Sequence, residues 1–220
     1  MHIFSPLLVS IYSNGLAFKS NLPMLKNLEK RSLMPRIIAI VGIVDRPYAT
    51  RLWRFMEMAL REQGFQGEFI LERHFYWPWQ KSRIQHFART ILTTQDNGKP
   101  VLLLGYSLGG VIAQHLAHQF IQSPVIGVVS FCSPLAFAPL WKLHLPQTTS
   151  FPRFNIMGMT DFFVPFPLGY AHIVNTRLSW WNHLFSFIVF KKPAQTVAKY
   201  VMLILNCHRD SLNMEHTHEL

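Results

Sequence analysis

Short apolar runs alternate with longer stretches of helical periodicity along residues 36–205. The apolar runs have the length and the continuity that are typical of strands buried on both faces. The predicted strands are 36–43, 67–74, 100–106, 125–132, 153–159 and 170–175. The predicted helices are 49–63, 79–95, 108–121 and 193–205. Strands that alternate with helices predict an α/β fold, a compact and mostly parallel sheet of about six strands with helices on both faces.

Residues 49–63 show the helical periodicity clearly. Apolar side chains recur there every three or four residues, and Gly64 provides a stop signal. The predicted apolar face consists of Leu52, Phe55, Met56, Ala59 and Leu60.

The domain that contains this alternation is expected to cover residues 35–206, which leaves two segments outside it. A chain of 220 residues suits one domain with a full core. We expect residues 1–34 to form an N-terminal extension and residues 207–220 a polar C-terminal tail. The apolar start lacks the basic region and the small-residue cleavage site of a signal peptide. Met34 immediately precedes the first predicted strand, so residues 1–34 are either a targeting segment or a stretch before the true start.

Composition excludes a disordered chain and argues against a membrane-spanning one. Half of the residues are hydrophobic, 15% are charged, and the mean hydropathy is +0.16. The uncharged run 124–141 contains Pro134 and Pro139, which predicts a strand and a loop instead of a spanning helix. The two cysteines form no disulfide framework, which favours a reducing, cytoplasmic location.

The net charge of +10 bears on the partners of the chain. It comes from 21 Lys and Arg residues against 11 Asp and Glu residues. The basic residues form no continuous tract, and their densest cluster is Lys26, Lys30, Arg31 and Arg36. An apolar protein with this charge suits weak, peripheral association with an anionic membrane surface better than binding of nucleic acid. The oligomeric state stays open.

Ser107 stands in the sequence Gly-Tyr-Ser-Leu-Gly-Gly, between a predicted strand and a predicted helix. Two interpretations compete here: a tight turn that needs small residues, and a nucleophile. A helix N-terminus supplies free N–H groups and a positive potential beside the hydroxyl. Within a strand–turn–helix unit the Gly-x-Ser-x-Gly pattern favours the nucleophile.

A nucleophilic serine needs an orienting acid and a base, and the chain offers few of either. After Ser107 the first carboxylate is Asp161, which follows a predicted strand; the remaining ones, Asp210, Glu215 and Glu219, lie in the polar tail. The histidines after Asp161 are His172, His183, His208, His216 and His218. We favour His183 as the base because His172 lies inside the predicted strand 170–175 and the others lie in the tail.

With Ser, Asp and His in this order, the chain resembles the α/β-hydrolase family over residues 36–205. The motifs are "GYSLGG" at the nucleophile, "GMTDFFVP" at the acid, "NHLF" at the histidine and "FCSP" after the fourth strand. The resemblance implies an oxyanion hole formed by the N–H of Leu108 and that of Ile43, or of Val44. The His-Gly pair that is usual in lipases is absent from that loop.

Apolar residues near these motifs indicate the substrate. Residues 135–151 resemble a reduced lid, with Leu135, Phe137, Leu140, Trp141, Leu143 and Leu145 expected to cover a bound chain. We also expect Tyr106, Val44 and Phe162 to line the pocket. The sequence therefore predicts a serine hydrolase, a carboxylesterase or lipase acting on small-molecule or lipid esters with apolar acyl chains.

Two other classes remain: a non-catalytic interaction protein with this fold, and a membrane-peripheral binding protein. His115 and His118 are three residues apart, but a surface role is favoured over a metal site. We expect no metal and no cofactor, because phosphate loops, dinucleotide motifs and cysteine clusters are absent from the sequence.

Overall fold

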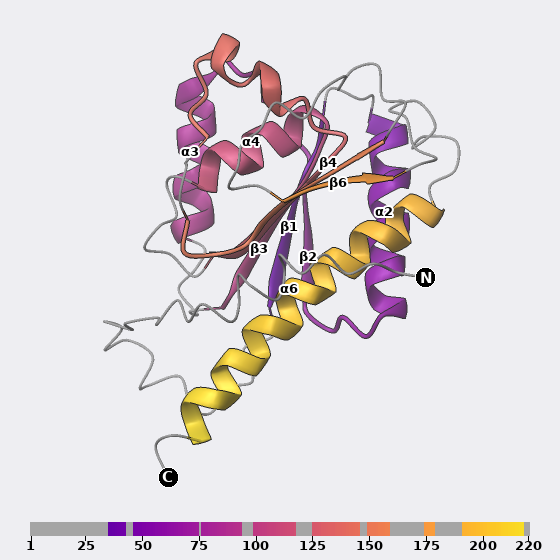
Figure 1. Cartoon of the computed structure of the whole chain (residues 1–220). Coiled ribbons are helices and arrows are strands. Elements are labelled where there is room, and N and C mark those ends of the chain that lie inside the picture. Colours follow the sequence, from indigo (N-terminus) through magenta and orange to yellow (C-terminus); the bar gives the residue numbers. More distant parts are fainter. Residues whose placement is uncertain are drawn as a thin grey trace. The chain divides into compact units, whose positions relative to one another are not determined.

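A six-stranded parallel sheet organises the chain in the computed structural model (Figure 1). The strand order is β2-β1-β3-β4-β5-β6, and all neighbouring strands pair in parallel. The strands are β1 Arg36–Ile40, β2 Glu68–Glu72, β3 Val101–Tyr106, β4 Val125–Phe131, β5 Arg153–Gly158 and β6 Val174–Leu178. The structure describes residues 35–42, 46–74, 76–93, 99–117, 125–145, 149–158, 174–178 and 191–217.

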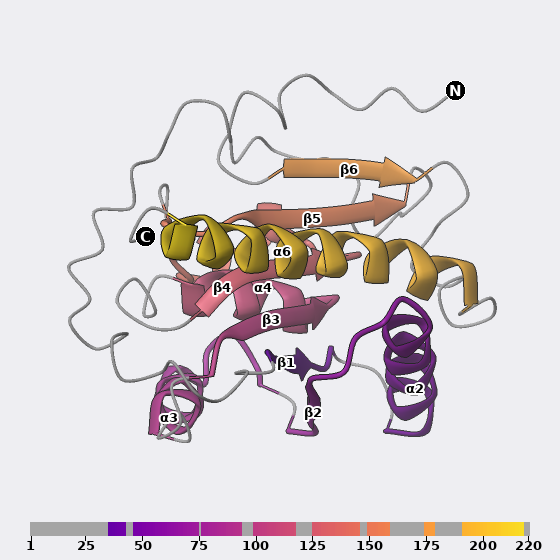
Figure 2. The same ribbon diagram turned by 90° about the horizontal axis from the view of Figure 1, so that it is seen from below.

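Helices cover both faces of the sheet, as predicted. They are α2 Arg46–Glu62, α3 Lys81–Thr93, α4 Leu108–Leu116 and α6 Lys191–Thr217. Two short 3-10 helices, η3 Leu135–Phe137 and η4 Pro139–Trp141, follow β4. Figures 1 and 2 show α3 and α4 on one face and the contacting pair α2 and α6 on the other.

The side chains of the strands alternate between two buried layers. Ile38, Ile40 and Leu103 belong to the apolar cluster that includes residues of α3 and α4. On the other face, the Phe131 ring lies 5.6 Å from that of Trp53 in α2. Strand β3 is buried at every position, which explains its unbroken apolar sequence.

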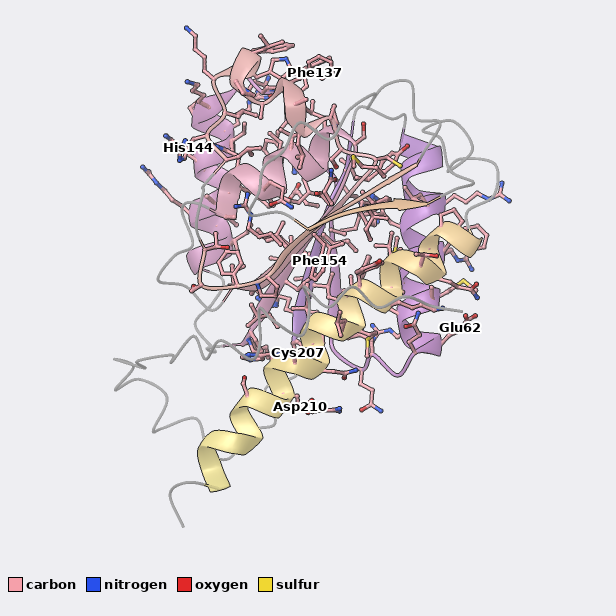
Figure 3. All side chains as sticks on the ribbon, viewed as in Figure 1. Glu62, Phe137, His144, Phe154, Cys207 and Asp210 are labelled. Atoms are coloured by element: carbon pink, nitrogen blue, oxygen red, sulfur yellow. The ribbon has the colours of Figure 1, made fainter. Side chains whose placement is uncertain are left out.

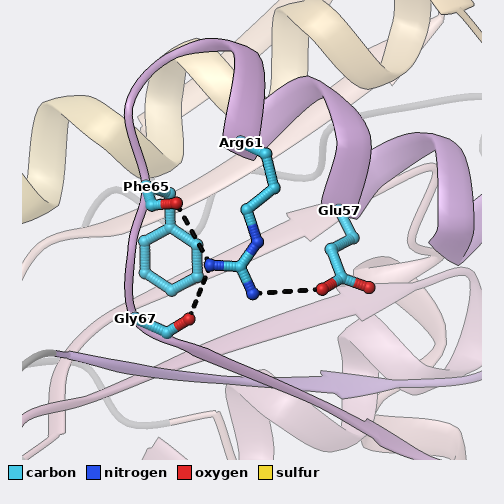
Figure 4. Close-up of polar contacts among 4 residues, drawn as sticks. All are labelled: Glu57, Arg61, Phe65 and Gly67. Atoms are coloured by element: carbon cyan, nitrogen blue, oxygen red, sulfur yellow. Dashed lines mark hydrogen bonds and ion pairs between the residues drawn. The ribbon is translucent and has the colours of Figure 1, made fainter.

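The predicted stop at Gly64 is confirmed by the geometry of the α2 C-terminus. Gly64 has φ +91°, and its N–H donates to the Arg61 carbonyl, while the Phe65 N–H donates to the Leu60 carbonyl. These bonds form a Schellman motif, which favours glycine in the left-handed conformation. The Arg61 guanidinium also donates to the carbonyls of Phe65 and Gly67 and pairs with Glu57 (Figure 4). This turn therefore fixes the path from α2 into β2.

The structure adds three details to the sequence prediction. Trp53, which the periodicity did not select, is fully buried in α2, whereas Phe55 is half-buried beside Arg51. Strand β6 covers Val174–Leu178, and residues 170–173 of the predicted strand 170–175 lie outside the described residues. Helix α6 continues to Thr217, so residues 207–217 of the expected polar tail belong to this helix.

Candidate active site

Ser107 occupies the sharp turn between β3 and α4. Its backbone angles are φ 53° and ψ −125°, outside the regions that L-residues ordinarily adopt. The Ser107 N–H donates to the Phe131 carbonyl, and the Ser107 carbonyl accepts from the Gly110 N–H. Bonds on both sides therefore hold the strained residue in place, and strain of this kind, about 1–3 kcal/mol, clusters at functional sites.

Glycines let α4 approach the sheet closely at this turn. A Cβ on Gly105 would lie 2.4 Å from the Gly110 Cα, and one on Gly109 would lie 2.3 Å from the Ile40 carbonyl oxygen. Both positions therefore require glycine, as the sequence motif predicts. A Cβ on Gly110 would lie 1.9 Å from the Ser133 Oγ, which adds a third such position.

The surroundings of Ser107 suit the stabilisation of an anion. Leu108 is the first residue of α4, and the first N–H groups of a helix have no partner within that helix. Gly42, after β1, also lies against the serine, because a Cβ there would be 3.4 Å from the Ser107 Oγ. The residue after Gly42 in sequence is Ile43, the predicted second oxyanion donor.

The neighbouring strand ends in a second unusual turn. Cys132 follows β4, is buried and has φ 49°, and its N–H donates to the Ile156 carbonyl of β5. Ser133 Oγ donates to the Phe131 carbonyl and lies against Gly110. The "FCSP" motif therefore packs on the first turn of α4 and supports it.

Four buried polar side chains connect α4 to β4 and β5. Arg153 Nε donates to Gln114 Oε1 at 2.8 Å, and Gln114 Nε2 donates to Ser130 Oγ at 3.1 Å. Ser130 Oγ lies 3.0 Å from the Asn155 Oδ1. Burial lowers the pKa of Arg153 to about 10, so its guanidinium stays protonated at neutral pH. We call Gln114, Ser130, Arg153 and Asn155 the polar quartet.

The polar quartet was not selected from the sequence. Gln114 lies within the apolar stretch 111–117, and Arg153 and Asn155 alternate with apolar residues in β5. Polar residues inside apolar segments were the available signal, but their partners are 16 to 40 residues apart in sequence.

The predicted site residues divide into described and undescribed ones. Ser107, Leu108, Tyr106, Leu135 and Phe137 are described. Asp161, His183, His172, Ile43, Val44 and Phe162 lie outside the described residues. The Tyr106 ring packs in the core 5.0 Å from that of Phe131, so its role in a substrate pocket stays a prediction.

The expected lid is only partly separate from the core. Leu135, Leu143 and Leu145 are buried in the same apolar cluster as residues of α3 and α4, so they contribute to the stability of the fold. Phe137 and Leu140 are exposed. Figure 3 shows Phe137 on the segment of short helices, well away from Phe154 inside the sheet.

Within the described ranges, His, Cys, Asp and Glu nowhere form a group of three that could hold a metal ion. None of the helices in those ranges has both the length and the hydrophobicity needed to cross a membrane.

Comparison with known proteins identifies the fold. No model of a known protein family matches the sequence, and no curated protein matches it. Among solved structures, Est1E from Butyrivibrio proteoclasticus is similar, with a TM-score of 0.62 and 9% identity over 82% of this chain and 91% of that one. The MGS-MChE2 α/β-hydrolase enzyme, from the metagenome of sediments of the Mar Chica lagoon in Morocco, has a TM-score of 0.55 and 16% identity. That match covers 76% of this chain and 90% of the other.

A third similar structure is an esterase from Pyrobaculum calidifontis, with a TM-score of 0.53 and 11% identity. That match covers 80% of this chain and 77% of the esterase. The chain has the α/β-hydrolase fold, as its motifs predicted. Identities this low establish the fold alone.

Proposed function

We propose that the protein is a serine hydrolase that cleaves ester bonds through Ser107. The observation that carries the proposal is the left-handed backbone of Ser107, φ 53°, between a buried strand and a helix N-terminus. A tight turn without a catalytic role would use glycine here at no steric cost. A strained turn that places a serine hydroxyl beside a helix N-terminus makes that serine suited to nucleophilic attack.

Asp161 and His183 complete the proposed triad. Asp161 is three residues beyond Gly158, the last residue of β5, and His183 is five residues beyond Leu178, the last residue of β6. The carboxyl ends of parallel strands meet at one edge of a sheet, so connections this short favour positions near Ser107.

The positions of the strands also favour His183 over the alternative base, His172. His172 precedes Val174, the first residue of β6, by two residues. The amino end of β6 lies at the edge of the sheet opposite to Ser107, because β3 to β6 run parallel.

The reaction follows from these roles. His183 accepts the proton of the Ser107 hydroxyl as its oxygen attacks the ester carbonyl, and Asp161 holds the imidazole in the required tautomer. The N–H groups of Leu108 and Ile43 stabilise the oxyanion. The protonated His183 then gives its proton to the departing alcohol. Water attacks the acyl-enzyme by the same route and releases the acid.

A fluorophosphonate probe tests the nucleophile directly. It should label the wild-type protein and the Ser133→Ala variant, whose altered serine is buried one strand away. The Ser107→Ala variant should not be labelled. Labelling of Ser107→Ala at the wild-type rate, or a folded wild-type protein that is not labelled, would overturn the proposal.

The other two members of the triad are tested by turnover. Asp161→Asn and His183→Ala should each lower the hydrolysis of p-nitrophenyl esters by about 10⁴-fold, because triad residues act as a unit. His172→Ala is the control and should keep turnover. The reverse result for the two histidines would assign the base to His172.

The apolar segment after β4 suggests the acyl group. Each buried methylene contributes about 0.8 kcal/mol, roughly fourfold in specificity. We expect kcat/KM to rise from the acetate ester to acyl chains of about six to ten carbons. A flat profile would indicate that the segment only completes the core.

A further inference from the structure

Exposed apolar side chains are concentrated in two short segments. Six large apolar side chains are exposed in the described part of the chain. Two of them, Met58 and Leu203, lie singly on α2 and α6, where isolated exposure needs no explanation. The other four lie within residues 77–79 and 137–140, and they are Trp77, Trp79, Phe137 and Leu140. Leu140 is 75% exposed and Trp79 is 64% exposed.

The two segments lie at the same edge of the sheet. Residues 73–80 follow the carboxyl end of β2, and residues 133–143 follow the carboxyl end of β4. Three strand spacings separate β2 from β4, a distance of roughly 14 Å. One buried cluster underlies both segments, because it includes Tyr76 from the first and Leu135 from the second. We call the exposed side chains of both segments the aromatic edge.

The aromatic side chains within each segment contact one another, which restricts their conformations. The rings of Trp77 and Trp79 stack at 4.6 Å, and those of Phe137 and Trp141 lie 6.0 Å apart. Trp141 is half-buried and packs against the core cluster. The rings therefore form a preorganised surface, which loses little conformational entropy when it is covered.

Positive charge predominates in the segments that carry the aromatic edge and at the start of α3. The exposed cations of the two segments and the first turn of α3 are Arg73, Lys81, Arg83 and Lys142. The described carboxylate in the same region is Glu72, which pairs with His74 at 2.6 Å. Four cations against one carboxylate leave an excess of three positive charges, which complements an anionic surface.

We propose that the aromatic edge is the face by which this protein docks on an anionic phospholipid surface. Tryptophan rings and leucine enter the boundary between headgroups and acyl chains, while Lys and Arg bind the phosphates above it. The docking surface lies at the carboxyl edge of the sheet, where Ser107 is found. Its connection with lipid ester hydrolysis rests on the proposed function, but the binding itself does not require Ser107 to be catalytic.

Vesicle co-sedimentation of the Ser107→Ala protein tests the proposal without consumption of lipid. The probe is a vesicle of phosphatidylcholine with phosphatidylglycerol as the minority component. The double variant Trp79→Gln and Leu140→Gln should lower the partition coefficient at least about tenfold, because both side chains lose their apolar contact with lipid. The matched control replaces Met58 and Leu203, the exposed apolar residues elsewhere, by Gln and should change binding less than about twofold.

The charge component has its own pair of variants. Lys81→Glu with Arg83→Glu should lower binding by roughly fivefold or more per residue and abolish the preference for phosphatidylglycerol over pure phosphatidylcholine. Arg54→Glu with Lys199→Glu carries the same charge change on exposed positions of α2 and α6 and is the control. Equal losses in a variant and its control would overturn the proposal, because they would reflect net charge or hydropathy alone.

Two further outcomes separate this proposal from its rivals. A self-associating protein that becomes monomeric in the Gln double variant, without vesicle binding in the wild type, would assign the aromatic edge to a second copy of the chain. If the double variant loses solubility, Leu140→Gln alone decides, because the Leu140 side chain is 75% exposed. Vesicle binding by a protein whose Ser107 resists the fluorophosphonate probe would keep the docking surface and reject the hydrolase.

Discussion

The two faces of the sheet are held to their helices by different kinds of contact. On the α2 and α6 face, aromatic rings interlock: Phe131 contacts Trp53 and Tyr106, and Phe154 contacts Tyr200 of α6 at 5.5 Å. On the α4 face, the apolar cluster is interrupted by the polar quartet and by glycines in close backbone contact. The helix that begins beside Ser107 is therefore held by directional bonds as well as by apolar contacts, while aromatic contacts hold the opposite face.

This difference has a physical meaning. Apolar burial is non-directional and stabilises a helix in several orientations of similar energy. Hydrogen bonds between buried groups are satisfied in one register only, because an unpaired buried group costs about 1–3 kcal/mol. The α4 face thus adds directional bonds to its apolar contacts, which gives α4 the defined position that a helix orienting a nucleophile requires.

The largest effect is expected on the apolar face. Phe131→Ala should lower the free energy of unfolding by about 3–5 kcal/mol, because it removes a fully buried ring between Trp53 and Tyr106. Denaturant unfolding measures it. Phe55→Ala, at a half-buried position of α2, should cost much less and serves as the control. If the two variants lose equal free energy of unfolding, the Phe131 ring is not the main contact of this face.

A smaller effect is expected within the polar quartet. Gln114→Ala should lower the free energy of unfolding by about 1.5–3 kcal/mol, because the buried Arg153 guanidinium loses the acceptor of its Nε–H. It should also speed hydrogen exchange in α4 selectively. A general loss of stability would instead speed exchange throughout the protein. Gln63→Ala removes the hydrogen bond from the turn after α2 to the Gln195 carbonyl of α6 and should cost about 0.5–1.5 kcal/mol. Uniform exchange in both variants would show that the quartet does not position α4.

The backbone contacts of α4 give a comparable or smaller loss. Gly109→Ala should lower the free energy of unfolding by about 1–3 kcal/mol, because its Cβ would meet the carbonyls of Ile40 and Val41. The same substitution should slow labelling of Ser107, since α4 has to move away from β1. Gly64→Ala is the control at the end of α2. The positive φ of Gly64 strains an alanine there, but no atom lies within 4 Å of the added Cβ. Equally slow labelling of Ser107 in Gly64→Ala would contradict the idea that the position of α4 controls the reactivity of Ser107.

The smallest effect is a pH dependence on the α3 side. Burial, with the charge of Glu72 as a second cause, raises the pKa of Tyr76, whose ring stacks on that of Phe87 at 5.1 Å. The unfolded tyrosine ionises near its ordinary value of about 10, so Tyr76 stabilises the folded protein below that pH and loses this contribution above it. Tyr76→Phe should therefore lose less stability than the wild type between about pH 9 and about pH 11. Parallel stability curves for the two proteins would contradict the raised pKa.

The sequence by itself determined the parts of this protein that depend on local pattern. Apolar runs and helical periodicity predicted the strands β1 to β5 and the helices α2 to α4 within a few residues, because burial imposes those periods on neighbouring positions. The glycines around Ser107 predicted the turn between β3 and α4, because only small residues fit its backbone. The order of carboxylates and histidines after Ser107, and their places after predicted strands, marked Asp161 and His183, which stay predictions.

Only the tertiary structure decided the features that join distant positions. The order of the strands, the burial of Trp53, and the bond from Arg153 to Gln114 across 39 residues follow from how the helices settle on the sheet. The register of β6, in which Val174 pairs with Phe154 of β5, and the extension of α6 to Thr217 became visible only in the structure. The sequence around a residue does not identify its partner in such contacts, because their free energy depends on partners that only the folded chain brings together.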